Sequence, residues 1–265
     1  MKSILRADQI RWRLNVVREK ARGGLTSLGW LELLSLLPKS STCWPHERFA
    51  LPDLAELCKY ITPLGELYGP PSDRAALGGT ALEVLSGAYD FRAVSVHPDD
   101  VVIDLGAHLG TFTRLSLRRG AKQVVAVEAS PTNAGFLRRS FSTEIRQNRV
   151  AVVQCPIWSS KTVVRFEGRS LTGHVSNSGE EMQTTTVDEI VTTLSLPRVD
   201  FIKADIEGAE RHALQGAIRT IAAHRPKLAF CVYHYPDDPE VLGAFAHEHG
   251  YHKYFDGSGR YIYCW

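Results

Sequence analysis

From residue 86 to the end of the chain, short apolar runs alternate with segments whose apolar residues recur at helical spacing. Apolar runs of this length are typical of strands buried on both faces, and helical crossovers between them imply parallel neighbours. The pattern predicts an α/β protein with a doubly wound, mostly parallel sheet and helices on both faces. The expected strands are residues 101–104, 124–128, 149–154, 200–204 and 227–233, with two more between 251 and 265.

Capping residues mark where several of the helices should begin. Ser130 precedes Pro131, which pairs a side-chain acceptor with a proline suited to the first helical turn. Thr186 and Glu189 have the spacing of a capping box. Apolar residues of residues 208–223 share one helical face, so a single helix is predicted there.

Two strand-like segments, residues 163–166 and 183–187, flank a polar stretch over residues 168–182. The arrangement predicts a hairpin inserted into the alternating pattern. A hairpin at this point and the N-terminal segment are the candidate covers for a substrate.

The N-terminal part of the chain has a different pattern. Residues 4–37 place apolar residues between basic ones, which predicts a basic amphipathic helix that either packs as a cap or touches a membrane surface. The apolar run of residues 25–38 is too short to span a bilayer. Residues 63–80 are rich in proline and glycine and are read as a linker. We therefore expect residues 1–80 to form a helical extension with a linker, and residues 81–265 to form the main domain.

Composition narrows the functional classes. The chain has 265 residues, of which 44% are hydrophobic and 23% charged, as in ordinary globular proteins. The net charge of +2 gives no broad basic field for nucleic acid, although residues 1–24 hold seven basic and two acidic side chains. The five cysteines are scattered without CxxC spacing, which argues against a disulfide framework or a zinc site. No signal-peptide pattern is present, so a cytoplasmic location is expected.

The segment VVIDLGAHLGTFT (residues 101–113) has the layout of a nucleoside-binding turn. A strand leads into a bend with Gly106 and Gly110, and the next strand ends at Glu128, 22 residues after Gly106, where a carboxylate can bind ribose hydroxyls. The bend lacks the GxGxxG pattern of pyrophosphate sites, and Asp104 precedes it. An anion there would repel phosphate but suits an amino group and a positive sulfur. The pattern therefore predicts S-adenosylmethionine as the cofactor and a methyltransferase as the class.

The residues expected to contact this cofactor lie in the bend and after the second strand. The two glycines have an alternative reading as packing or turn residues, and His108 is expected to contribute mainly its backbone. The expected contacts are Asp104, Gly106, Ala107, His108, Gly110, Thr111, Phe112, Glu128 and Ala129.

A second strand end, KADIEGAE (residues 203–210), brings acidic residues to the same edge of the sheet. Asp205 ends an apolar strand, which favours a catalytic role for it. Glu207 and Glu210 begin a helix, where carboxylates are also stabilised by the helix dipole alone. Lys203 lies within the strand and either pairs with one of these acids or reaches the site.

A third strand end, CVYHYPDD (residues 231–238), carries His234. Two roles remain open for it. Its imidazole can accept the proton of an acceptor hydroxyl, with Asp205 and Glu207 as the other candidate catalytic residues. Alternatively, Asp205 and His234 can bind a divalent cation that lowers the pKa of the hydroxyl.

The segments VVIDLGAHLGTFT, AVEASPTN, TTVDEI, FIKADIEGAE and CVYHYPDD occur in this order across residues 101–238. Together they resemble the FkbM family of S-adenosylmethionine-dependent methyltransferases. The resemblance implies a Rossmann-like class I methyltransferase sheet of seven strands, the last antiparallel. It also implies O-methylation of a sugar or natural-product hydroxyl, with Asp104, Gly106, Gly110 and Glu128 at the cofactor. The chain departs from the family by having His108 in place of Asn, and Val232 in place of Glu.

Other functions predict features that the sequence lacks or leaves open. A dehydrogenase requires the missing GxGxxG turn. A methyltransferase acting on exocyclic amines of DNA or RNA uses an Asn/Asp-Pro-Pro-Tyr/Phe motif, whereas this strand end reads ADIEG. An RNA methyltransferase and a non-catalytic S-adenosylmethionine-binding scaffold remain the alternatives to a small-molecule enzyme. Tyr89 is expected either to line the pocket or to pack under the first helix.

Overall fold

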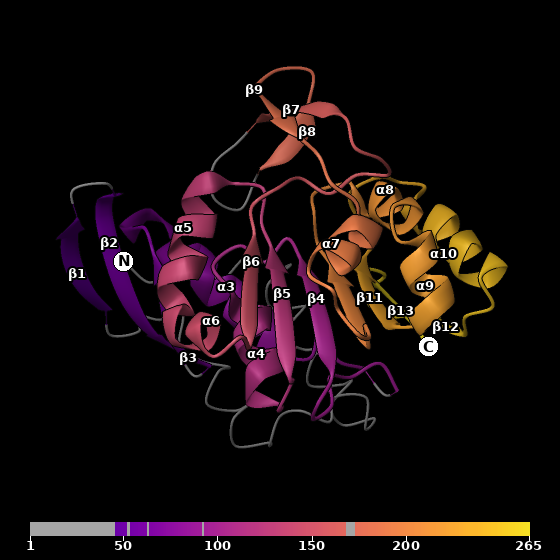
Figure 1. The fold of residues 1–265 in the computed structure, drawn as a ribbon, viewed down its shortest axis with the longest axis horizontal. Coiled ribbons are helices and arrows are strands. Elements are labelled where there is room, and N and C mark those ends of the chain that lie inside the picture. The colour runs from indigo at the N-terminus through magenta and orange to yellow at the C-terminus, as the bar shows by residue number, and fades with distance from the viewer. Residues whose placement is uncertain (1–45, 52–53, 63, 92, 168–172) are drawn as a thin grey trace.

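The computed structural model describes residues 46–265 except residues 52–53, 63, 92 and 168–172. At its centre lies a seven-stranded sheet (Figure 1) with the order β12-β13-β11-β10-β4-β5-β6. Neighbours from β11 to β6 pair in parallel, whereas β13 runs antiparallel to β11 and β12. The strands are β4 (Val101–Leu105), β5 (Gln123–Val127), β6 (Val150–Val153), β10 (Phe201–Ala204), β11 (Lys227–Cys231), β12 (Lys253–Phe255) and β13 (Tyr261–Cys264). The predicted Rossmann-like sheet, with its antiparallel last strand, is confirmed.

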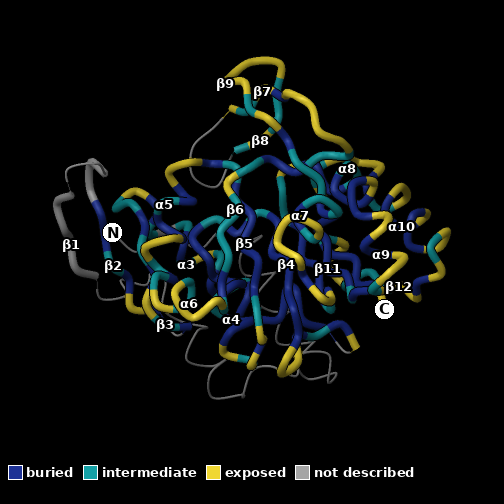
Figure 2. Tube along the Cα trace, viewed as in Figure 1, coloured by how far each residue is buried: buried dark blue, intermediate teal, exposed yellow. Residues whose placement is uncertain are grey.

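Helices cover both faces of this sheet because successive strand residues point to opposite sides. Val102 and Val124 pack into one buried cluster, and Ile103 and Val125 into the other (dark blue interior in Figure 2). The first cluster includes residues of α3 (Arg74–Leu85), α4 (Thr111–Arg118) and α5 (Pro131–Ser140), the last of which is followed by α6 (Ser142–Arg146). The second includes residues of α7 (Val187–Thr193), α8 (Glu210–Gln215), α9 (Ile218–His224) and α10 (Asp238–Glu248).

The predicted helix starts are confirmed where a single side chain determines them. Ser130 Oγ accepts a hydrogen bond of 3.3 Å from Asn133 N, and Pro131 is the first residue of α5. Thr186 Oγ1 accepts one of 3.0 Å from Glu189 N at the start of α7.

The single helix predicted over residues 208–223 is instead two helices, α8 and α9. Asp188 lies beside the break, and its carboxylate accepts hydrogen bonds from the backbone N–H groups of Arg219 (3.1 Å) and Thr220 (2.7 Å). An external carboxylate therefore satisfies the free donors at the start of α9. The prediction was wrong because this partner comes from another part of the chain.

The N-terminal described segment is a small antiparallel sheet (indigo in Figure 1) of β1 (His46–Leu51), β2 (Leu54–Thr62) and β3 (Gly65–Gly69). A 3-10 turn, η1 (Pro71–Asp73), joins it to α3. The linker predicted over residues 63–80 is wrong, because Leu67 and Leu77 are fully buried and join the core under the main sheet. The expected domain boundary after residue 80 falls inside α3. The helix expected over residues 4–37 lies outside the described residues.

The predicted insertion is a three-stranded antiparallel sheet above one edge of the main sheet (Figure 1). It consists of β7 (Val163–Glu167), β8 (His174–Ser176) and β9 (Glu180–Gln183). The pairing of β7 with β9 agrees with a hairpin, but the second strand covers Glu180–Gln183 instead of the predicted residues 183–187, and β8 within the polar stretch was not foreseen.

The cysteines and the helix lengths bear on the predictions about disulfides and membrane spans. The cysteines in the described part of the chain, at positions 58, 155, 231 and 264, are all free thiols. Within that same part, every helix is too short or too polar to cross a bilayer.

One arginine joins the N-terminal sheet to the main domain. Arg114 on α4 donates to the carbonyl oxygens of Glu66 (3.0 Å) and Ser140 (2.8 Å) and forms an ion pair of 2.5 Å with Glu144. Tyr68 N donates to Ser140 Oγ at 2.8 Å in the same region. The guanidinium thus contacts hydrogen-bond acceptors in β3, α5 and α6 at the same time.

We expect Arg114→Ala to lower the free energy of unfolding by about 2–3 kcal/mol, because partly buried charged hydrogen bonds are lost. Urea unfolding followed by circular dichroism would measure it. The matched control is Arg165→Ala, which removes an exposed pair with Glu181 and should change stability by less than about 1 kcal/mol. Equal losses in the two variants would show that Arg114 does not hold the segments together.

Candidate functional site

A cavity of about 930 Å³, counting the solvent at its mouth, opens at the carboxyl ends of the central strands. Doubly wound sheets bind their ligands at this edge. The turn after β4, the end of β5 and the end of β10 line it, together with α3 and the insertion.

Two glycines shape the turn after β4 in different ways. Gly106 has a φ of +74°, and a Cβ there would lie 1.9 Å from Asp205 O, so only glycine lets the turn lie against the end of β10. Gly110 has a φ of +90°, and a Cβ there would lie 2.4 Å from the ring of Phe141. Gly106 lines the cavity, whereas Gly110 packs against α5.

Five other predicted cofactor residues also line the cavity: Ala107, His108, Thr111, Phe112 and Ala129. His108 has a φ of +50°, and its Nε2 lies 3.7 Å from Asp73 Oδ2. The imidazole of His108 thus faces the carboxylate of Asp73.

Glu128 follows β5, and its carboxylate bridges the turn after β4 and the start of α5. Its Oε2 accepts a hydrogen bond from His108 N (2.8 Å), and its Oε1 accepts one from Ser130 N (2.9 Å). Burial raises the pKa of Glu128, and these two backbone donors oppose that shift. Its carboxylate lines the cavity where the sequence predicts a ribose-binding group.

Asp104 does not line the cavity. It is fully buried and accepts a hydrogen bond from Thr113 Oγ1 (2.7 Å), while Lys203 Nζ lies 3.1 Å from its Oδ1. The ammonium of Lys203 also donates to the carbonyl oxygens of Leu105 (3.1 Å) and Gly106 (2.9 Å). Asp104 thus holds Lys203, and Lys203, which lines the cavity, holds the turn.

Asp205 lines the cavity at the end of β10. Its carboxylate accepts a hydrogen bond of 2.8 Å from the Tyr89 hydroxyl and a long one of 3.4 Å from Tyr233. Burial alone would raise the pKa of Asp205, but the charge of Lys203 and the Tyr89 hydroxyl hold it below its ordinary value. Asp205 is therefore an anion beside the space for a ligand.

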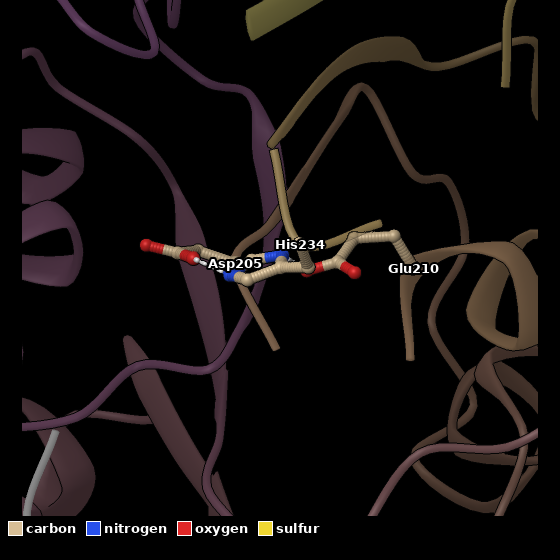
Figure 3. Close-up of side chains that lie close together, drawn as sticks. All are labelled: Asp205, Glu210 and His234. Carbon is tan, nitrogen blue, oxygen red and sulfur yellow. Dashed lines mark ion pairs between the residues drawn. The ribbon is translucent and has the colours of Figure 1, made fainter. Parts of the chain in front are cut away.

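His234 lies between carboxylates (Figure 3). Its Nδ1 is 3.2 Å from Glu210 Oε1, and its Nε2 is 3.7 Å from Asp205 Oδ1 and 3.6 Å from Glu207 Oε2. Burial of the imidazole favours the neutral form, but Glu210 and the other two acids raise the pKa of His234 above its ordinary value. The structure thus brings together all three predicted catalytic residues and adds Glu210.

Glu207 is the most exposed of these acids and lies on a constrained backbone. Its φ is +53°, and its side chain lines the cavity. Burial, with the neighbouring charge of Asp205, raises the pKa of Glu207. A group of this kind can accept a proton or a cation at the cavity wall.

Residues 104–253, more than half of the chain, match the model of the FkbM methyltransferase domain. The chain belongs to the FkbM methyltransferase family. It therefore contains a methyltransferase domain of this family, and the family implies S-adenosylmethionine as the methyl donor. No curated protein matches the chain.

Solved structures similar to the chain include two methyltransferases, and the first of them shares its fold. The FkbM methyltransferase from Methylobacillus flagellatus KT is 22% identical, with a TM-score of 0.50 over 63% of this chain and 44% of that one. The match thus spans less than half of that protein. Precorrin-6y C5,15-methyltransferase from Geobacter metallireducens GS-15 is 17% identical, with a TM-score of 0.38 over 64% of this chain and 81% of that one.

Sequence reasoning missed several residues at this FkbM site. Glu83 of α3 lines the cavity and lies 3.3 Å from Arg260. Phe166 and His174 of the insertion line the opposite wall. The tyrosine at position 89, for which two roles were open, lines the cavity and is also packed in the core. No local motif marks these residues, because each reaches the site through tertiary packing.

We expect Lys203→Met to lower the free energy of unfolding by about 3–5 kcal/mol, because it leaves Asp104 buried without a counter-charge. Replacing both partners, in Lys203→Met with Asp104→Asn, should recover much of this loss. Denaturant unfolding of the two single variants and the double variant would measure the coupling. Additive losses would show that the pair does not act as a unit.

Proposed function

We propose that this FkbM methyltransferase transfers the methyl group of S-adenosylmethionine to a hydroxyl group of a small molecule, such as a sugar or another natural product. One observation carries the proposal: a single cavity is lined both by a nucleoside-type turn with Glu128 and by the acids Asp205 and Glu207, and His234 lies behind these two acids without lining the cavity itself. The turn with Glu128 suits the cofactor, and the acids with His234 suit an acceptor that must lose a proton.

The Glu128 end supports binding of the adenosine part. Each carboxylate oxygen already accepts one backbone hydrogen bond, and the side chain of Asn133 also hydrogen-bonds the carboxylate, so its direction is fixed while one lone pair is left for a ribose hydroxyl. Phe112 and Ala129 add apolar surface beside it. Because Asp104 is neutralised by Lys203, the groups we propose for the positive end of the cofactor are Asp205 and Glu207.

The reaction is an in-line displacement in which the acceptor oxygen attacks the methyl carbon. The carbon–sulfur bond breaks as the carbon–oxygen bond forms, the electron pair goes to sulfur, and S-adenosylhomocysteine leaves. The donor is already activated, so alignment and exclusion of water supply most of the rate. The hydroxyl proton passes to the Asp205–His234 end of the cavity, and the insertion over the cavity serves as the acceptor cover.

The cofactor part of the proposal predicts that Glu128→Gln weakens S-adenosylmethionine binding about tenfold or more, because the charged acceptor for the ribose hydroxyls is lost. Isothermal titration calorimetry would measure the affinity. Glu240→Gln, at an exposed position on α10, is the matched control and should bind normally. Equal affinity in both variants would place the ribose elsewhere.

The transfer step predicts that a metabolite extract given methyl-labelled S-adenosylmethionine yields a labelled methyl ether. With the acceptor so identified, His234→Ala should turn over about 100-fold more slowly or worse, while calorimetry shows unchanged cofactor affinity. Label on a nitrogen or on RNA would contradict the proposal. Cofactor binding without any transfer in the extract would favour the scaffold alternative.

A further inference from the structure

The acidic cluster around His234 has an unusual geometry for a purely structural ion pair. One ligand-type atom from each of Asp205, Glu210 and His234 lies within 4.8 Å of the others (Figure 3). The side chain of His234 is only 9% exposed, yet neither ring nitrogen makes a hydrogen bond to any described residue. A buried polar group without such a bond normally has a partner that completes it.

We propose that Asp205, Glu207 and His234 bind a divalent first-row transition-metal ion, such as Mn²⁺, with Glu210 as the acid that orients the imidazole. The three proposed ligand atoms are Asp205 Oδ1, Glu207 Oε2 and His234 Nε2, at 3.7 Å and 3.6 Å from oxygen to nitrogen. Ligands about 2.0–2.2 Å from an ion stand roughly 3.0–3.5 Å apart, so each of the two carboxylate oxygens needs to approach Nε2 by only a few tenths of an ångström. Glu207 lies outside the group whose ligand atoms are all within 4.8 Å of one another, so binding also requires its 40% exposed side chain to move toward Asp205.

Glu210 has a different role, although it is equally close. Its Oε1 accepts a hydrogen bond from Ile206 N (2.8 Å), and its Oε2 accepts one from Gly208 N (3.0 Å), so the carboxylate is fixed by the backbone. It is fully buried and faces Nδ1 of His234 at 3.2 Å. A histidine that binds a metal through one nitrogen typically donates from the other to a carboxylate of this kind.

The ligand set selects the class of ion. One imidazole nitrogen with two carboxylate oxygens suits divalent transition metals, whereas Mg²⁺ and Ca²⁺ favour oxygen ligands alone. Asp205 and Glu207 both line the cavity, so water or a hydroxyl oxygen can complete the coordination from that side. The competing arrangement has no metal, and a protonated His234 alone balances the acids.

A role for this ion in chemistry rests on the proposed function. An ion held there would take the place of direct proton transfer to His234: it lowers the pKa of a coordinated acceptor hydroxyl, and the released proton goes to solvent before the oxygen attacks the methyl group. Metal binding itself requires neither cofactor nor acceptor. Failure of methyl transfer with normal metal binding would therefore contradict only the proposed function.

Titration of the chelator-treated protein with Mn²⁺, followed by electron paramagnetic resonance of the free ion, tests the site. We expect one saturable site, with affinity at least about 100-fold weaker in His234→Gln and about 10–100-fold weaker in Glu210→Gln. The matched control is His247→Gln, an exposed histidine of α10, which should bind like the unaltered protein.

A second measurement does not depend on the folding of any variant. Electron spin-echo modulation of Mn²⁺ bound to the unaltered protein should show coupling to a single directly bound imidazole nitrogen. Absence of saturable binding, binding unchanged by His234→Gln, or bound Mn²⁺ without nitrogen coupling would each overturn the proposed site.

Discussion

The buried pair of Lys203 and Asp104 is the interaction on which the site depends. The two residues are directly opposite each other on the parallel strands β10 and β4, in a region where an unpaired charge would be very costly. The lysine also binds the carbonyl oxygens of residues 105 and 106. One cation therefore fixes the turn after β4 against the neighbouring strand end, where Gly106 allows the contact with Asp205.

The same lysine influences the chemistry at the cavity wall. Lys203 lies in β10 and Asp205 directly follows the end of this strand, and Lys203 is close enough for its charge to act on the Asp205 carboxylate. The charge of Lys203 keeps the pKa of Asp205 low in spite of its burial. Lys203, held by Asp104, thus has two effects. It fixes the turn through the carbonyl oxygens of residues 105 and 106, and it lowers the pKa of Asp205 at the cavity wall.

Sequence alone predicted those features that local patterns determine. The mostly parallel, doubly wound sheet could be expected from the alternation, and the starts of α5 and α7 from capping by Ser130 and Thr186. The role of Asp104 could not be read in the same way, because its partner follows about 100 residues later and depends on strand register. The break between α8 and α9 was hidden for the same reason, since Asp188 comes from a different helix.

In the candidate site, too, local patterns predicted some residues, whereas contacts between distant segments could not be predicted. Asp205, Glu207 and His234 were identified because each follows an apolar strand at the sheet edge. Glu210 was read as an acid at a helix start, and it does accept backbone hydrogen bonds there. Its second contact, with His234, arises only when β10 and β11 lie side by side. A capping pattern in the sequence therefore does not distinguish a purely structural carboxylate from one that orients a site residue.

Charge balance links the two ends of the cavity. Four carboxylates meet two basic side chains around the end of β10: Asp104, Asp205, Glu207 and Glu210 with Lys203 and His234. With all four acids ionised, this group carries a net charge of −2 when the imidazole is protonated and −3 when it is neutral. A low-dielectric wall of that sign favours positive ligands. A sulfonium cofactor supplies one positive charge and a divalent ion two, so both proposed ligands are drawn to the same wall. Methyl transfer then removes the sulfonium charge, which weakens the attraction for the product relative to the substrate cofactor.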